Sequence, residues 1–117
     1  ICFLGVTFKA NTDDMRDSSC LFMIPPLVKK GAKINYYDPT GEKPELKKIR
    51  NVNFLDNINS AIKDSDLIII HTEWNDFKTI NFKKEVKNKK VIIFDMRNIY
   101  SSVKMKREKI KYFAIGC

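Results

Sequence analysis

The sequence predicts an α/β fold: a Rossmann-like, doubly wound parallel sheet in three α/β/α layers, formed by a single domain. Short, continuous apolar runs occur at ICFLGV, DLIIIHT and KVIIFD, and such runs are typical of strands covered on both faces. Stretches with apolar residues at helical spacing alternate with these runs, as in a parallel α/β sheet. The length of 117 residues is that of one domain and is enough to bury a core.

The first predicted strand, ICFLGV, leads through a charged turn into a helix. Ser18 or Ser19 can cap the N-terminus of this helix. Apolar residues then recur at helical spacing, at Leu21, Ile24, Leu27 and Val28. The sequence KKG at 29–31 suits the end of a helix. Pro25 and Pro26 each remove an amide donor and clash one turn back, so we expect a kinked or late-starting helix.

The remaining strands are predicted from apolar runs bounded by turn residues. They are AKINYYDP, VNFL, DLIIIHT (66–72), KVIIFD (90–95) and IKYFAIG (110–116). Between them we expect a short helix or turn at 44–49, an amphipathic helix at 57–63 and helical or turn spacing within 73–88. The lysine-rich stretch 104–111 is predicted to be a solvated edge before the last strand. Right-handed crossovers would give the strands a doubly wound order.

Composition limits the class of protein. The net charge is +8, but the lysines are scattered and alternate with acidic and amide residues, so a nucleic-acid-binding domain is the less favoured alternative. No apolar run approaches the roughly 18 residues of a membrane span. The chain begins at Ile1, within a predicted buried strand, so we expect a fragment of a longer protein.

The three cysteines form neither a disulfide framework nor a zinc motif, because they are odd in number and lack a C-x-x-C pair. We interpret Cys2 and Cys20 as buried apolar residues of a protein in the reducing cytoplasm. Cys117 is the third.

The predicted site lies at the carboxyl ends of the strands, where ligands bind in such sheets. Charged residues follow three strands, in FKANTDDMR, HTEWNDF and DMRNIY. Lys9, Arg16 and Arg97 can therefore converge on one anion. The alternative for each is a surface cation or an ion pair with a nearby aspartate. After Gly5 the turn lacks the glycines of G-x-G-x-x-G, so we do not expect a dinucleotide site within this domain alone.

Other polar residues are better explained by structure than by chemistry. His71 ends a buried strand, and we expect it to be a hydrogen-bonded structural residue rather than a base. Asp13 and Asp14 are neighbours that point apart, so we expect them to stabilise the turn rather than to bind a metal. No catalytic constellation and no metal site can be assembled from the sequence.

Four motifs, in order and over nearly the whole chain, resemble the nucleotide-sugar dehydrogenases, the UDP-glucose and UDP-N-acetylmannosamine dehydrogenase family. VTFKANTDDMRDSS resembles G-x-x-F-K-x-x-T-D-D-x-R-x-S, and INYYDP resembles the strand that follows. HTEWNDF resembles T-E-W-x-x-F, and IFDMRNIY resembles F-D-x-R-N-x-Y. The resemblance is to the family's C-terminal, UDP-binding domain. It implies a two-fold NAD-dependent oxidation of the sugar C6 alcohol to a carboxylate, through a thiohemiacetal and a thioester on a cysteine.

The resemblance also implies roles for individual residues. Phe8, Lys9 and Arg97 match positions that contact the UDP-sugar, and Arg16 matches a position that reaches NAD. Asp13 and Asp14 would orient these cations and the turn.

The family's catalytic cysteine and most of its NAD site belong to N-terminal and central domains that the resemblance does not cover. None of the three cysteines here occupies the nucleophile's place, so no catalytic residue is expected and the isolated fragment should be inactive. In the family, dimerisation uses the central domain, so the parent enzyme is expected to be a homodimer.

Two alternatives remain within the resemblance. The first concerns the substrate: the E-W dipeptide after Thr72 favours UDP-glucose, and a UDP-N-acetylmannosamine-type domain is the alternative. The second alternative is a nucleotide-binding module without catalytic activity. Pro25 and Pro26 depart from the family, which usually keeps this helix regular.

Overall fold

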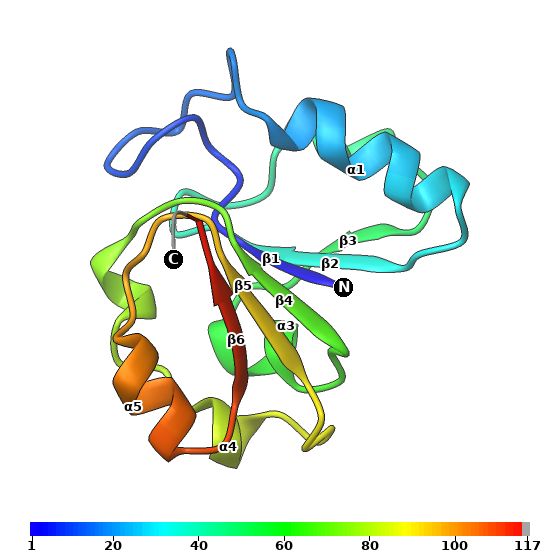
Figure 1. Cartoon of the computed structure of the whole chain (residues 1–117). Helices are drawn as coiled ribbons and strands as arrows, with labels where there is room; N and C mark the ends of the chain where they lie inside the picture. The colour runs from blue at the N-terminus through cyan, green and yellow to red at the C-terminus, as the bar shows by residue number, and fades with distance from the viewer. Residues whose placement is uncertain (116–117) are drawn as a thin grey trace.

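The computed structural model describes residues 1–115 and contains one six-stranded parallel sheet, in the order β3-β2-β1-β4-β5-β6 (Figure 1). The order runs in opposite directions from β1 and from β4, so the predicted doubly wound fold is confirmed. The strands are β1 (Cys2–Leu4), β2 (Ile34–Tyr37), β3 (Val52–Phe54), β4 (Leu67–Ile70), β5 (Ile92–Asp95) and β6 (Lys111–Ala114).

Helices cover both faces of the sheet, with α1 on one face and α3, α4 and α5 on the other (Figure 1). Leu46 of α2 packs in the same apolar cluster as Ile24 of α1, so α2 lies on the face of α1. The helices are α1 (Cys20–Lys29), α2 (Pro44–Lys47), α3 (Ile58–Ile62), the 3-10 turn η1 (Asn75–Phe77), α4 (Phe82–Glu85) and α5 (Ser102–Arg107).

Each face of the sheet has its own apolar core, because alternate strand residues point to opposite sides. Phe3 and Ile69 pack beneath α1 and α2, whereas Leu4 and Ile70 pack against α3, α4 and α5. Cys2 and Cys20 are buried free thiols in these two cores, as predicted. Cys117 and the end of the strand predicted at 110–116 lie outside the described residues.

For the first helix we expected a kink or a late start, and the late start is wrong. It begins at Cys20, directly after the serines, and continues through both prolines to Lys29, so it does not start late. Pro25 and Pro26 lie on its exposed side. Water can therefore satisfy the carbonyls of Leu21 and Phe22, which lose their intrahelical donors.

The lysine-rich stretch gives a second correction, because its first part is a helix. Ser101 caps α5 by accepting a hydrogen bond from the Lys104 amide, and Met105 is buried against the sheet. One buried methionine is too weak a periodic signal to predict a helix from sequence. None of the described helices is long and apolar enough to cross a membrane.

The carboxyl ends of β1 and β4 approach each other unusually closely at Gly5. This residue has φ +79°, and a Cβ added there would lie 2.5 Å from the Cβ of Thr72. Only glycine satisfies both the left-handed backbone and the lack of space. Gly5 therefore sets the distance between the two strand ends that border the candidate site.

We expect Gly5→Ala to lower the free energy of unfolding by about 3 kcal/mol, because it adds a steric clash to the cost of a left-handed backbone. Gly41→Ala is the matched control: its φ is +94°, but no atom lies within 4 Å of an added Cβ. The free energy of unfolding of Gly41→Ala should fall by only about 1 kcal/mol. Urea unfolding measures both, and equal losses would show that the contact with Thr72 imposes no constraint.

Candidate functional site

Three loops meet where the strand order reverses, at the carboxyl ends of β1, β4 and β5. These strands are neighbours in the sheet, so residues 5–18, 71–77 and 96–100 leave it at adjacent points. The blue loop after β1 extends beyond the sheet and leads into α1 (Figure 1). The three loops in which the sequence places charged residues therefore lie next to one another.

The loop after β1 is held by the end of β2. The buried carboxylate of Asp38 accepts hydrogen bonds from the Val6 amide at 2.9 Å and from the amide and hydroxyl of Thr40. In a dinucleotide-binding sheet, an acidic residue near this point binds the ribose. Here the amides of Val6 and Thr40 and the Thr40 hydroxyl occupy that carboxylate.

Arg97 is the residue that joins the loops. Its Nε donates to the backbone oxygen of His71 at 2.8 Å, and one terminal nitrogen donates to the backbone oxygen of Phe8 at 3.3 Å. Its guanidinium therefore connects the loop after β4 with the loop after β1, from a position after β5. The side chain remains exposed, so its other N–H groups can reach a ligand.

The buried carboxylate of Asp95 shapes the loop that carries Arg97. It accepts hydrogen bonds from the amides of Arg97, Ile99 and Tyr100, and from the hydroxyl of Tyr112. Its partners are thus loop amides and a phenol rather than the Arg97 guanidinium. From the sequence we expected nearby aspartates only as ion-pair partners of the cations and did not predict this role of Asp95, although an aspartate at the end of an apolar strand is a recognisable signal.

Phe8 lies next to Arg97 in the loop after β1, because Arg97 donates to its backbone oxygen, and Lys9 follows Phe8 in the chain. The Phe8 amide donates to the Asp14 backbone oxygen at 3.0 Å, and the Thr7 hydroxyl donates to the Lys9 backbone oxygen at 3.0 Å. The Phe8 side chain is 46% exposed and the Lys9 side chain is exposed. The structure thus brings Phe8 and Arg97 together, with the exposed Lys9 next to Phe8 in the chain.

Arg16 faces a different hollow. It forms an ion pair with Asp14 at 3.0 Å, with its side chain 89% exposed, and Asp14 also accepts a hydrogen bond from the Arg16 amide. These bonds from Arg16 lower the pKa of Asp14. Arg16 lines this hollow together with Thr40, Lys43 and four acidic residues, Asp13, Asp14, Glu42 and Glu45. Arg16 therefore lines a hollow that does not include Arg97, and the ion pair with Asp14 orients its guanidinium.

His71 is a structural residue, as predicted, and it connects α1 with the site. Its Nε2 shares a hydrogen bond with the Ser19 hydroxyl at 2.7 Å, and its Nδ1 shares one with the Thr72 hydroxyl at 3.1 Å. Burial lowers the pKa of His71 to about 4, and the charge of Arg97 acts in the same direction. The imidazole is therefore neutral at pH 7.

Two polar groups at this edge escaped the sequence analysis. Lys43 is only 4% exposed and donates to the Thr40 hydroxyl. Trp74 Nε1 is the one buried side-chain donor among residues 1–115 without a hydrogen-bond partner. Neither could be found from sequence, because lysine is usually exposed and the tryptophan follows an ordinary loop pattern. No cluster of His, Cys, Asp or Glu able to hold a metal ion occurs in the described part of the chain.

The chain is similar in sequence to a known protein family. Residues 2–102 match the model of the UDP-glucose/GDP-mannose dehydrogenase family, UDP binding domain. The chain is 35% identical over 117 residues to a UDP-glucose 6-dehydrogenase of Rhizobium meliloti and 38% identical over 120 residues to one of Rickettsia bellii. Each match covers 99% of this chain and 27% of the relative, so the chain spans about a quarter of the relatives' length.

A solved structure shows the same relationship. The UDP-D-ManNAc dehydrogenase from Pyrococcus horikoshii superposes with a TM-score of 0.73 at 26% identity. The match covers 98% of this chain and 25% of that one.

The buried His71 predicts how stability depends on pH. Its pKa falls from 6.5 in the unfolded chain to about 4 in the folded one, so its contribution is complete above pH 6.5 and is lost as the pH falls towards 4. Between pH 7 and pH 5 we expect a loss of about 2 kcal/mol in the free energy of unfolding. His71 is the only histidine, so urea unfolding of a His71→Gln variant should lack most of this pH dependence. An unchanged dependence in that variant would contradict the assignment.

Proposed function

The chain belongs to the UDP-glucose/GDP-mannose dehydrogenase family, and on that premise we propose that it binds the UDP-sugar of an NAD-dependent UDP-glucose 6-dehydrogenase. That enzyme would oxidise UDP-glucose to UDP-glucuronate. The single observation that carries the proposal is the position of Arg97, a fixed guanidinium at the switch point of a sheet whose family model is a UDP-binding domain.

The geometry of Arg97 suits a diphosphate. Two of its five N–H groups are used by backbone oxygens of the site, and these bonds fix the plane of the guanidinium. For the remaining N–H groups the described residues supply no acceptor, so they can bind phosphate oxygens as a fork. Lys9 adds a mobile charge beside it, and the exposed ring of Phe8 can pack against the apolar face of the nucleotide or sugar.

The chain alone does not fit a complete NAD site. The G-x-G-x-x-G turn is absent, and Asp38 is occupied by Val6 and Thr40. We therefore assign Arg16 a single contact with NAD, from the separate hollow that it lines, and assign most of the NAD site to another domain of the parent enzyme. When bound, NAD would accept the hydride, while this chain's part is to bind and orient the UDP-sugar.

In this proposal the chain is a C-terminal domain of a cytoplasmic, homodimeric enzyme. The catalytic cysteine and the dimer contacts would belong to preceding domains, and the isolated chain would bind nucleotide without catalysis. This part of the proposal is supported by the relatives, which are about four times as long.

A UDP-N-acetylmannosamine substrate is the second candidate, because a solved structure that superposes on the chain is a UDP-D-ManNAc dehydrogenase. UDP-glucose is favoured by the higher identity to UDP-glucose 6-dehydrogenases, at 35% and 38%. Parallel titrations with the two UDP-sugars would separate these candidates. Salt-sensitive DNA binding without UDP binding would instead support a nucleic-acid-binding domain.

The role of Arg97 can be tested by titrating the chain with UDP and following its amide resonances by NMR. We expect Arg97→Ala to weaken UDP binding roughly 10- to 100-fold, because charged hydrogen bonds to the diphosphate are lost. Arg97→Lys should recover part of the affinity, since it restores the charge but not the fork.

Lys47→Ala is the control for net charge, because Lys47 is an exposed lysine of α2. It should leave UDP binding nearly unchanged. Equal effects of Arg97→Ala and Lys47→Ala would contradict the proposed role of Arg97.

A further inference from the structure

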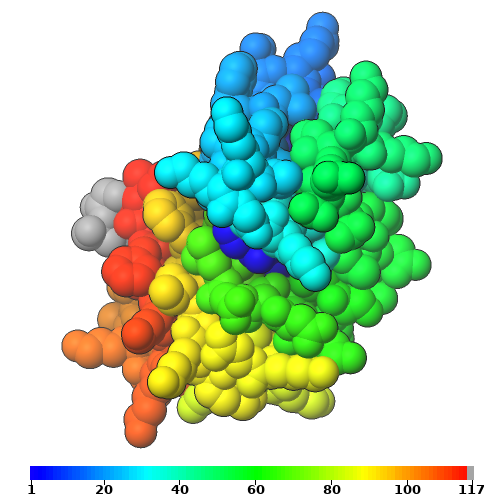
Figure 2. All heavy atoms as spheres, turned by 90° about the vertical axis from the view of Figure 1, so that its right-hand side faces the viewer, coloured from blue at the N-terminus to red at the C-terminus, as the bar shows by residue number. Residues whose placement is uncertain are grey.

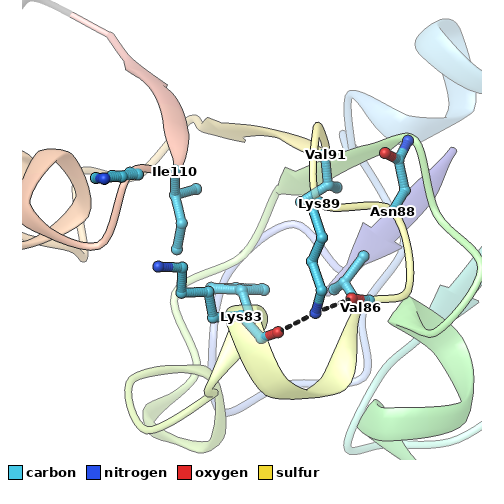
Figure 3. Close-up of a pocket in the computed structure, with 8 residues that line it drawn as sticks. Lys83, Val86, Asn88, Lys89, Val91 and Ile110 are labelled. Atoms are coloured by element: carbon cyan, nitrogen blue, oxygen red, sulfur yellow. Dashed lines mark hydrogen bonds between the residues drawn. The ribbon is translucent and has the colours of Figure 1, made fainter.

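A small cavity lies near the amino ends of β5 and β6, whereas the candidate site lies at the carboxyl ends of the strands. It lies between α4, the loop that follows α4, and the turn between α5 and β6 (Figure 3). Figure 2 views the molecule from the side where the chain begins, with the yellow segment containing α4 and its loop at the bottom. The cavity is thus separate from the loops that carry Phe8, Lys9 and Arg97.

The walls of the cavity are apolar. They consist of Phe82, Val86, Val91 and Ile110. Phe82, Val86 and Val91 are at most 5% exposed, so these walls are continuous with the core. The cavity has a volume of about 120 Å³. An apolar cavity of about 150 Å³ accommodates benzene, so this somewhat smaller space suits a short aliphatic group or part of a ring.

The polar lining is basic and lacks an acidic residue. It consists of Lys83, Lys89, Lys109 and Asn88. Lys89 donates to the backbone oxygens of Lys83 and Val86, which holds its ammonium group beside the cavity (Figure 3). Lys83 and Lys109 have no ion-pair partner among residues 1–115. The lining therefore contains three cationic side chains and no anionic one, which favours an anion at the mouth.

The backbone at Lys109 is unusual. It follows the end of α5 with φ 59°, and the next amide, of Ile110, donates back to the Met105 oxygen. Glycine is the usual residue at this helix end, because a side chain costs free energy in the left-handed region. The chain keeps a lysine there, at the rim of the cavity.

We infer that this cavity binds a small monocarboxylate with a compact apolar body, such as an aromatic acid. The ring would occupy the apolar space between Val86 and Ile110, and the carboxylate would meet the ammonium groups of Lys83 and Lys109. The site is independent of the proposed UDP-sugar site, since the two lie at opposite edges of the sheet.

Titration of the full chain with benzoate, followed by amide NMR, tests this inference. We expect saturable shifts confined to residues 82–91 and 109–111, and no shift at Phe8 or Arg97. Benzyl alcohol has a similar ring without the charge, and inorganic phosphate has the charge without the ring. Both should bind several-fold more weakly than benzoate.

Lys109→Gly is an informative variant, because it removes one ammonium group and also relieves the left-handed backbone. We expect a higher Tm together with roughly threefold weaker benzoate binding. Lys83→Gln should weaken binding to a similar extent, and Lys47→Gln, remote from the cavity, should not.

The inference is overturned if benzoate produces no saturable shift at Ile110, or if benzyl alcohol or phosphate binds as tightly as benzoate. Because UDP is titrated separately and shifts other residues, failure here leaves the proposed UDP-binding function standing, and the reverse also holds.

Discussion

The close approach of β1 and β4 at the switch point is the constraint on which the rest of the site depends. Gly5 allows the approach, and the Thr72 hydroxyl then donates to the Thr7 backbone oxygen at 2.9 Å. That bond ties the loop after β1 to the loop after β4. The two backbone oxygens that hold Arg97, those of His71 and Phe8, belong to these same loops. The position of the guanidinium is therefore a consequence of strand packing.

Two buried carboxylates complete this arrangement, because they accept hydrogen bonds from backbone amides of the loops. Asp38 fixes the start of one loop through Val6, and Asp95 fixes the loop that carries Arg97. Each replaces water at amides that would otherwise be buried without partners. The loops that carry the exposed cations Lys9 and Arg97 are thus held by buried anions, so a ligand meets loops that are already ordered. Preorganisation of this kind lowers the entropic cost of binding.

The fold can be predicted well from the sequence, because strands and helices are indicated by residues close together in the chain. Continuous apolar runs identify β4 and β5, and the alternation of strands and helices determines the doubly wound order. The course of α1 was predicted less well, since proline propensity does not reveal that Pro25 and Pro26 lie on the exposed side. The helix α5 was missed because only Met105 is buried in it.

The sequence predicts the cations of the candidate site but not the partners that hold them. The charge of Lys9, Arg16 and Arg97 is visible in the sequence, and so is their place after strands. Their partners are long-range contacts, such as the 89-residue separation between Arg97 and Phe8, and spacing along the chain does not encode them. The separation of Arg16 from Arg97 likewise depends on the ion pair with Asp14 and on the neighbouring α2.

A crystal structure of the chain with UDP would test the central claim most directly. The account predicts diphosphate oxygens within hydrogen-bond distance of the Arg97 guanidinium, with the bonds from Arg97 to the backbone oxygens of His71 and Phe8 retained. UDP bound elsewhere on the chain, or bound at this edge without contact to Arg97, would contradict it.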